Sequence, residues 1–231
     1  VELEAQQITA PRETERGNGP VEGYVAKRSV SATKTDTPII ETPQSISVIT
    51  ADRIRDQGSL TIQDSLRYVA GMRGEAYGFD SRGDFSLVRG VSPTIFLDGL
   101  QQSVGSYTNT RTDPFTLERI EVLKGPAAVL YGRGSQGGIV NRISKAPEAG
   151  RRSTLEAQGS SEDLRSLYAD LSADPTDTIS LRLNMGNEDS NSFRDGVSSH
   201  RQLFAPSMSW QLTPELNWLV QYEYSRFDRT P

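Results

Sequence analysis

After residue 150 the chain alternates strictly between apolar and polar residues. The stretch ISLRLNM, residues 179–185, places an apolar side chain at every second position. The same period recurs in residues 167–172, 203–212 and 218–225. Because successive side chains of a β-strand point to opposite faces, this period predicts strands with one apolar and one polar face.

The connections between these strands alternate in length. Residues 174–177 and 213–215 each contain a proline and predict tight turns, whereas residues 188–199 predict a long polar loop. Strands of about ten residues, with short turns at one end and longer loops at the other, are typical of a transmembrane β-barrel. An antiparallel sheet with one wet face is the alternative, and no single strand excludes it. We predict about five strands, too few to close a lumen-enclosing barrel.

Residues 31–150 combine short helices with short strands. Ser45–Thr50 alternates as a strand does, and Thr50 can cap a helix that follows it. Ser59 can cap a second helix, which ends at Gly71. The apolar positions of this second helix that share one face are Ile62, Leu66 and Val69.

Further short strands are predicted at residues 85–89, 95–97 and 120–123, with a tight turn at Asp98-Gly99. The long loops between them, residues 73–84 and 100–114, are rich in polar residues, and such loops are usually functional. Residues 1–30 are polar and contain several glycines and prolines. We predict that they form a flexible extension.

The composition narrows the class of protein. The hydrophobic share is 35 %, below the roughly 45–50 % of globular domains, which suits strands that are apolar on one side only. Basic residues number 25 against 30 acidic ones, which excludes a broad basic surface for nucleic acid. No cysteine is present, and His200 is the single histidine, for which we expect a solvated loop position. No apolar run reaches the roughly 18 residues of a membrane-spanning helix.

One motif suggests an enzyme. Gly132, Gly134 and Gly137 form a G-x-G-x-x-G pattern, which in dinucleotide-binding proteins follows a strand and begins a helix. Residues 127–131 could be a strand or a short helical turn, but the β-branched sequence after the glycines does not predict a helix. A dinucleotide-binding oxidoreductase is therefore only a remote alternative.

The same glycines belong to a longer stretch with a different resemblance. LERIEVLKGPAAVLYGRGSQGGIVNRISKAP, residues 117–147, resembles the end of the plug domain of TonB-dependent outer-membrane receptors. TKTDTPIIETPQSISVIT, DSLRYVAGM, LVRG and FLDGL precede it in the order found in that family. The first of these blocks is most similar to siderophore receptors of the ferrichrome and hydroxamate type.

The resemblance implies an α+β plug domain, a small mixed sheet with short helices, followed by antiparallel transmembrane β-barrel strands. The expected divisions are a flexible segment with a TonB box (residues 1–30), the plug (31–150) and the first barrel strands (151–231). The complete barrel would have about 22 strands, so we expect this chain to be a fragment.

The resemblance also implies a transporter without enzymatic activity or a resident cofactor. Its partners would be a ferric siderophore outside, TonB of the inner-membrane energy-coupling complex, and outer-membrane lipid, with no nucleic acid. The expected location is the outer membrane of a Gram-negative cell, with the N-terminus in the periplasm. Haem, cobalamin or a sugar is the alternative cargo for the same fold.

Candidate site residues follow from the same resemblance. Tyr107 falls on a ligand-contacting tyrosine of ferrichrome-type receptors, and Tyr77 falls where they have a ligand-contacting arginine, so Tyr77 matches by position and not by residue type. Arg73 and Arg82 flank the site and could supply positive charge. The expected TonB box is Ala5, Gln6, Gln7, Ile8, Thr9 and Ala10. Arg89 and Lys124 are expected to form ion pairs with carboxylates of the barrel wall beyond Pro231. Glu118, Arg119 and Glu121 are expected to hold the plug to the barrel.

Overall fold

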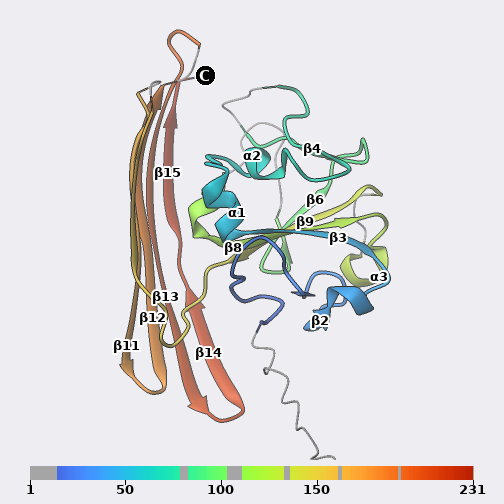
Figure 1. The fold of residues 1–231 in the computed structure, drawn as a ribbon, viewed down its shortest axis with the longest axis vertical. Helices are drawn as coiled ribbons and strands as arrows, with labels where there is room; N and C mark the ends of the chain where they lie inside the picture. The colour runs from blue at the N-terminus through green and yellow to red at the C-terminus, as the bar shows by residue number, and fades with distance from the viewer. Residues whose placement is uncertain are drawn as a thin grey trace, which may run out of the picture.

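The structure is a computed structural model that describes residues 15–78, 83–102, 111–132, 136–160, 163–191 and 194–230. An N-terminal domain with a five-stranded sheet lies against one face of a long antiparallel sheet, which we call the wall (Figure 1). This arrangement of a small mixed domain followed by antiparallel strands confirms the predicted fold class.

The sheet of the N-terminal domain is mixed, with strand order β3-β8-β9-β6-β7. Only the β6–β9 pair is parallel among these strands. Asp98 and Gly99 have φ angles of 50° and 79° and form the predicted tight turn between β6 and β7. The strands are β3 (Ser45–Thr50), β6 (Thr94–Leu97), β7 (Leu100–Gln101), β8 (Leu117–Lys124) and β9 (Gly138–Ser144).

Two short helices cover one face of this sheet. The Thr50 side chain caps α1 (Ala51–Asp56) by accepting a hydrogen bond from the Arg53 backbone N–H, as predicted. The prediction of Ser59 as the cap of the second helix is wrong, because α2 (Ile62–Leu66) begins after Thr61. Thr61 and Asp64 form a capping box, in which each side chain accepts a hydrogen bond from the other residue's backbone N–H.

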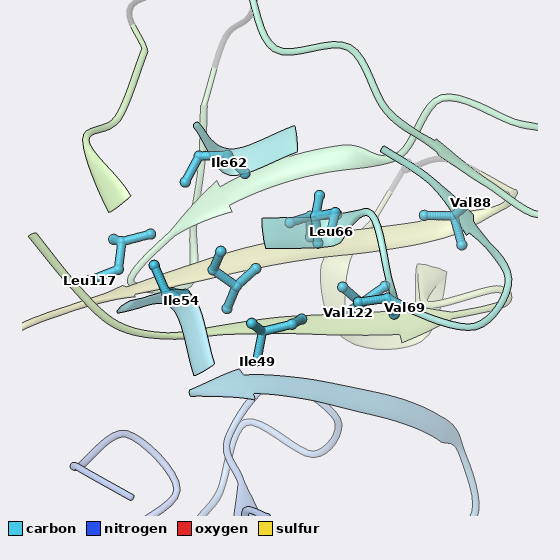
Figure 2. Packing of buried hydrophobic residues seen from close by; sticks show 10 residues of the cluster. Ile49, Ile54, Ile62, Leu66, Val69, Val88, Leu117 and Val122 are labelled. Carbon is cyan, nitrogen blue, oxygen red and sulfur yellow. The ribbon is translucent and has the colours of Figure 1, made fainter. Parts of the chain in front are cut away.

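The helices and the sheet enclose the main hydrophobic core. The predicted apolar face, Ile62, Leu66 and Val69, packs against Ile49 of β3 and Val122 of β8 (Figure 2). The remaining elements of the domain are short: β1 (Arg28–Ser29), β2 (Thr37–Pro38), η1 (Ile39–Glu41), β4 (Met72–Arg73), β5 (Leu87–Val88), η2 (Pro114–Thr116) and α3 (Ala128–Tyr131). The strand predicted at 85–89 is thus reduced to two residues, and the one predicted at 120–123 is longer.

The glycine motif lies between α3 and β9. The segment after Gly137 is a strand, and it pairs with β8 and β6 rather than beginning a helix. A phosphate-binding loop of the dinucleotide type needs a helix N-terminus at this point. The structure therefore rejects the dinucleotide reading.

The wall consists of β10 (Thr154–Gly159), β11 (Arg165–Thr176), β12 (Ile179–Asn191), β13 (Ser198–Thr213), β14 (Leu216–Gln221) and β15 (Tyr224–Arg229). Both β14 and β15 pair with β13, so they are consecutive halves of one strand interrupted at residues 222–223. The predicted number of about five strands agrees with this arrangement.

Two connections differ from their predicted positions. The tight turn after β11 lies at residues 177–178, and a register irregularity between Ala173 and Thr176 accommodates Pro175 within the strand. The loop predicted over residues 188–199 is shorter, because Glu188 pairs with Arg201 and extends both strands. His200 consequently lies in β13 rather than in a loop, beside Asp189.

The two faces of the wall differ in polarity. Arg182, Asn184 and Glu188 of β12 point toward the N-terminal domain and are buried, whereas Leu181 and Met185 of the same strand are exposed on the other face. The aromatic side chains exposed on the wall are Phe204, Trp210, Trp218, Tyr222 and Tyr224. In the described part of the chain, no helix is long and apolar enough to cross a membrane.

Candidate functional site: the domain–wall interface and the loop apex

Arg182 of β12 is the centre of one ion-pair cluster between the domain and the wall. Its guanidinium holds Asp170 of β11 in a bidentate pair at 2.7 and 2.8 Å, and it also reaches Glu118 of β8 at 3.1 Å. Lys145 lies 3.1 Å from the same Asp170 carboxylate. All four groups are nearly inaccessible to solvent, so breaking any pair leaves a buried charge.

Arg201 of β13 is the centre of a second cluster. It lies 3.0 Å from Glu188 of β12 and 3.4 Å from Asp113, the residue that caps η2. It also donates a hydrogen bond of 2.9 Å to the Leu60 carbonyl. Both clusters therefore combine an arginine of the wall, a carboxylate of the wall and a carboxylate of the N-terminal domain.

Tyr168 of β11 connects these polar contacts to an apolar one. Its hydroxyl donates to Asp113 at 3.0 Å, and its ring packs on Phe115 with a centroid distance of 4.7 Å. Gly186 is the cross-strand partner of Tyr168, and a Cβ at this position would lie 2.1 Å from the ring. Glycine at position 186 is thus what allows the ring to lie against β12.

Arg119 of β8 points away from the wall and holds residues 15–31, which we call the strap. The fully buried guanidinium donates to the carbonyls of Arg16, Gly19 and Arg28 at 2.9 to 3.0 Å. Glu121, two residues further along β8, accepts hydrogen bonds from the Ser29 hydroxyl and the Ser31 backbone N–H at 2.7 and 3.0 Å.

These contacts correct two predictions. Residues 15–30 were predicted to belong to a flexible extension, but backbone carbonyls and amides of the strap bond to buried charges of β8. Arg119 and Glu121 were expected to hold the plug to the barrel, but they hold the strap, and of that group Glu118 contacts the wall. Burial raises the pKa of Glu121, although the hydrogen bonds from Ser31 and Ser29 and the charge of Arg119 oppose the shift.

Two of the predicted ligand residues, Arg73 and Tyr77, lie in β4 or just after it, at the end of the domain that also contains α2 (Figure 1). Tyr77 is 73 % exposed and packs edge-on against Phe85, with a centroid distance of 5.9 Å. Arg73 is exposed on β4. Tyr107, Arg82 and the predicted TonB box, Ala5 to Ala10, lie outside the described residues.

Arg89 and Lys124 lie close enough for their charges to interact. Burial lowers the pKa of Lys124, and nearby Arg89 lowers it further. Lys124 donates to the Ser47 hydroxyl at 2.8 Å and to the Ala70 carbonyl at 3.2 Å, and Arg89 has the rare φ of 50°. Among the described residues no carboxylate pairs with either cation. Their pairing with a more distant part of the barrel wall stays a prediction.

Comparisons with known proteins agree with this architecture. Residues 38–139 match the TonB-dependent receptor plug domain family. The chain carries a TonB-dependent receptor plug domain. We therefore call the N-terminal domain the plug.

Among the similar proteins, the metal-pseudopaline receptor of Pseudomonas aeruginosa is 42 % identical over 99 % of this chain, and the match covers 33 % of that receptor. The ferrichrome outer membrane transporter and phage receptor of Escherichia coli is 31 % identical over 90 % of the chain and 29 % of its own length. The pyoverdine outer membrane receptor of Pseudomonas aeruginosa matches in structure with a TM-score of 0.83 and 28 % identity, over 97 % of this chain and 33 % of that one. The chain thus spans about a third of these relatives, which are named as receptors or transporters and not as enzymes.

The two ion-pair clusters around Arg182 and Arg201 do not follow from the alternating sequence pattern. Polar residues at alternate positions of β11 to β13 predicted the inward face, but the pattern did not distinguish residues that face water from residues that pair with the plug. The presence of charged residues inside strands is the sequence feature that could have indicated these clusters. Those residues are Asp170, Arg182, Glu188 and Arg201. Charges on a sheet face that is covered are expected to be paired.

Proposed function

We propose that this chain is part of an outer-membrane receptor that binds a ferric siderophore or a related metal chelate and imports it into the periplasm. The observation that carries the proposal is the plug packed on the polar face of wall strands whose other face is apolar. A wall that is apolar outside and polar inside suits a barrel in lipid with a hydrated lumen. A plug fixed in that lumen blocks free diffusion, so cargo requires binding and energy.

TonB is the proposed energy source, acting through the segment before the strap. TonB boxes bind by adding an extended strand to a sheet of the partner, so the proposed box needs an accessible backbone in residues 5–10. Glu15 is the first described residue of the strap, and its carboxylate accepts from the Lys27 backbone N–H at 2.9 Å. In this proposal, a pull by TonB on residues 5–10 reaches the strap, which follows them in the chain.

Two cargo classes follow from the relatives. The resemblance of the plug motifs favours a ferric hydroxamate of the ferrichrome type, and a relative of that name is 31 % identical. The higher identity of 42 % to the metal-pseudopaline receptor favours a metal–pseudopaline complex as the cargo. Haem, cobalamin and a sugar remain the alternatives for the same fold.

The test uses the full-length receptor in cells that lack their own uptake systems for the probes. Iron-55 ferrichrome and radiolabelled metal–pseudopaline are compared for equilibrium binding and for accumulation, with NADH as the probe for the oxidoreductase alternative. We expect one chelate to bind and accumulate, and deletion of residues 5–10 to leave binding intact while abolishing accumulation. Accumulation that survives the deletion would move the TonB box elsewhere. A receptor that binds NADH but neither chelate would refute the proposal.

A further inference from the structure

Two arginines, Arg142, which is buried, and Arg111, whose side chain is 10 % exposed, lie near the ends of the loops that precede β5 and η2. Arg142 belongs to β9, in the middle of the plug, and Arg111 immediately precedes Thr112 and the η2 cap. Neither residue was singled out by the sequence reasoning. Both donate hydrogen bonds to residues at the described ends of these loops.

Arg142 ties the two ends of one segment together. Its guanidinium donates to the Thr112 hydroxyl at 2.6 Å and also bonds to the Gln102 side-chain oxygen. Gln102 immediately precedes residues 103–110, which lie outside the described structure, and Arg111 and Thr112 follow them. One buried side chain therefore joins Gln102 to Thr112.

Arg111 ties that segment to the other apical loop. It lies 3.3 Å from the Asp84 carboxylate and donates to the Gly83 carbonyl at 2.9 Å. The next residue along the chain, Phe85, donates its backbone N–H to the Gln63 side chain of α2 at 3.1 Å and packs against Tyr77. The Asp84–Arg111 pair thus stands between the segment that precedes Thr112 and the loop that presents Tyr77.

The cavity at the pair is too small to hold a large ligand. Asp84, Arg111 and Arg142 line a cavity of about 40 Å³ together with apolar residues of α2 and β9, far below the roughly 300–1,000 Å³ of small-molecule sites. Burial raises the pKa of Asp84, although Arg111 and Arg142 both favour its charged form. A carboxylate held in such a place acts through the groups that it positions.

We propose that the Asp84–Arg111 ion pair is a clasp that fixes residues 83–85 against residues 111–112 and so positions Tyr77, which packs on Phe85, for contact with the ligand. Arg142 completes the clasp by joining Thr112 to Gln102. The inference rests on the proposed function, because it assigns to these residues the affinity of that same apical site. It does not require either residue of the pair to touch the ligand.

The experiment compares Arg111→Met, Asp84→Asn and the double variant in the full-length receptor, with whichever of ferrichrome and metal–pseudopaline the wild-type receptor binds as the probe. We expect each single variant to raise Kd about tenfold, which corresponds to about 1.4 kcal/mol of binding free energy. The double variant should raise Kd no further, because the two residues act as one pair. The maximal rate of uptake should stay unchanged.

The matched control is Arg67→Met. Arg67 pairs with Asp64 and Glu75 near the same end of the plug, but in an exposed ion pair, which contributes little. Hydrogen exchange gives a second readout that needs no ligand: backbone amides of residues 76–78 and 85–88 should exchange faster in Arg111→Met, while those of β8 and β9 stay protected. Arg111→Lys, which keeps the charge, covers the case in which Arg111→Met fails to fold, and it should recover part of the protection.

The outcomes separate the clasp from the function that it serves. Unchanged apical exchange in Arg111→Met, or an unchanged Kd with faster exchange, would overturn the clasp. Additive effects of the two single variants would also overturn it, because independent residues do not form a pair. A wild-type receptor that binds neither probe would refute the proposed function for those cargos, whereas the exchange result would still test the contact itself.

Discussion

Glu118 and Arg119 are neighbours in β8, yet they bond to opposite sides of the plug. Glu118 lies 3.1 Å from Arg182 of the wall, and Arg119 donates to the Gly19 carbonyl of the strap at 3.0 Å. Because consecutive side chains of a strand point to opposite faces, one strand joins the strap to the wall. A pull on the strap is therefore received by the same backbone that the wall holds in place.

Replacement of Arg182 by methionine should destabilise the plug–wall contact strongly. The change leaves Glu118 without its wall partner and Asp170 with Lys145 alone. Removal of one member of a buried ion pair costs about 3–5 kcal/mol of unfolding free energy. Urea unfolding of the full-length receptor in detergent measures this cost. Arg151→Met is the control, because Arg151 contacts Glu118 from a more exposed position, and an equal loss in both variants would contradict the prediction.

Replacement of Glu121 by glutamine should change how plug stability depends on pH. Burial raises the pKa of Glu121 in the folded protein above its value in the unfolded chain. The wild-type plug should therefore lose stability as the pH rises from the unfolded pKa through the folded one, because ionisation becomes unfavourable in the folded state. Glu121→Gln lacks this loss and keeps an acceptor for Ser29 and Ser31.

Calorimetry of the two receptors across this pH window measures the difference. The stability of Glu121→Gln relative to the wild type should be near zero at acid pH and should grow in favour of the variant toward neutral pH. A difference that shrinks as the pH rises would show that Arg119 stabilises the ionised carboxylate more than burial opposes it.

The two apical tyrosines predicted to contact ligand should differ in their effect on binding. Tyr107→Ala should weaken chelate binding by about 1–3 kcal/mol, the range of a lost aromatic anchor. Tyr77→Ala should cost less, because its match to the ferrichrome receptor is by position and not by residue type. Tyr68→Ala is the control for loss of an exposed tyrosine, since Tyr68 is 71 % exposed. Equilibrium binding to cells decides among the three, and unchanged affinity in Tyr107→Ala would remove that residue from the site.

Replacement of Gly186 by alanine should displace the Tyr168 ring. The added methyl group would lie 2.1 Å from the ring, so the contacts of Tyr168 with Asp113 and Phe115 cannot both persist. We expect a loss of about 1–3 kcal/mol, as for other overpacked sites. Gly159→Ala in β10 is the matched control, because its new methyl group would meet an atom only at 3.7 Å. Equal unfolding free energies of the two variants would show that the Tyr168 ring or the backbone of β12 moves to accommodate the methyl group at no cost in stability.

The wall strands could be predicted from sequence because their period reports burial directly. A strand with one apolar and one polar face has apolar and polar residues at alternate positions. In agreement with this period, Leu181 and Met185 are exposed on one face, whereas Arg182 and Asn184 are buried on the other. The strand ends were less certain, because Glu188 reads as a loop residue until its partner Arg201 is known. Thr61 was missed as a helix cap because Ser59 offers the same hydroxyl two residues earlier.

The strap could not be predicted, for a different physical reason. It is held by its own backbone carbonyls, which accept hydrogen bonds from Arg119, about a hundred residues away in the chain. Backbone acceptors are present in every segment, so no pattern of side chains distinguishes a held strap from a free tail. The Asp84–Arg111 clasp could not be predicted either, because in the sequence each partner is only a charged residue in a polar loop.

Arg182 and Arg201 each have a carboxylate partner within the wall, Asp170 and Glu188, in addition to the one supplied by the plug. Each of these inward arginines is therefore bound by a carboxylate of its own sheet as well as by Glu118 or Asp113 of the plug, so the position of its guanidinium does not depend on the plug alone.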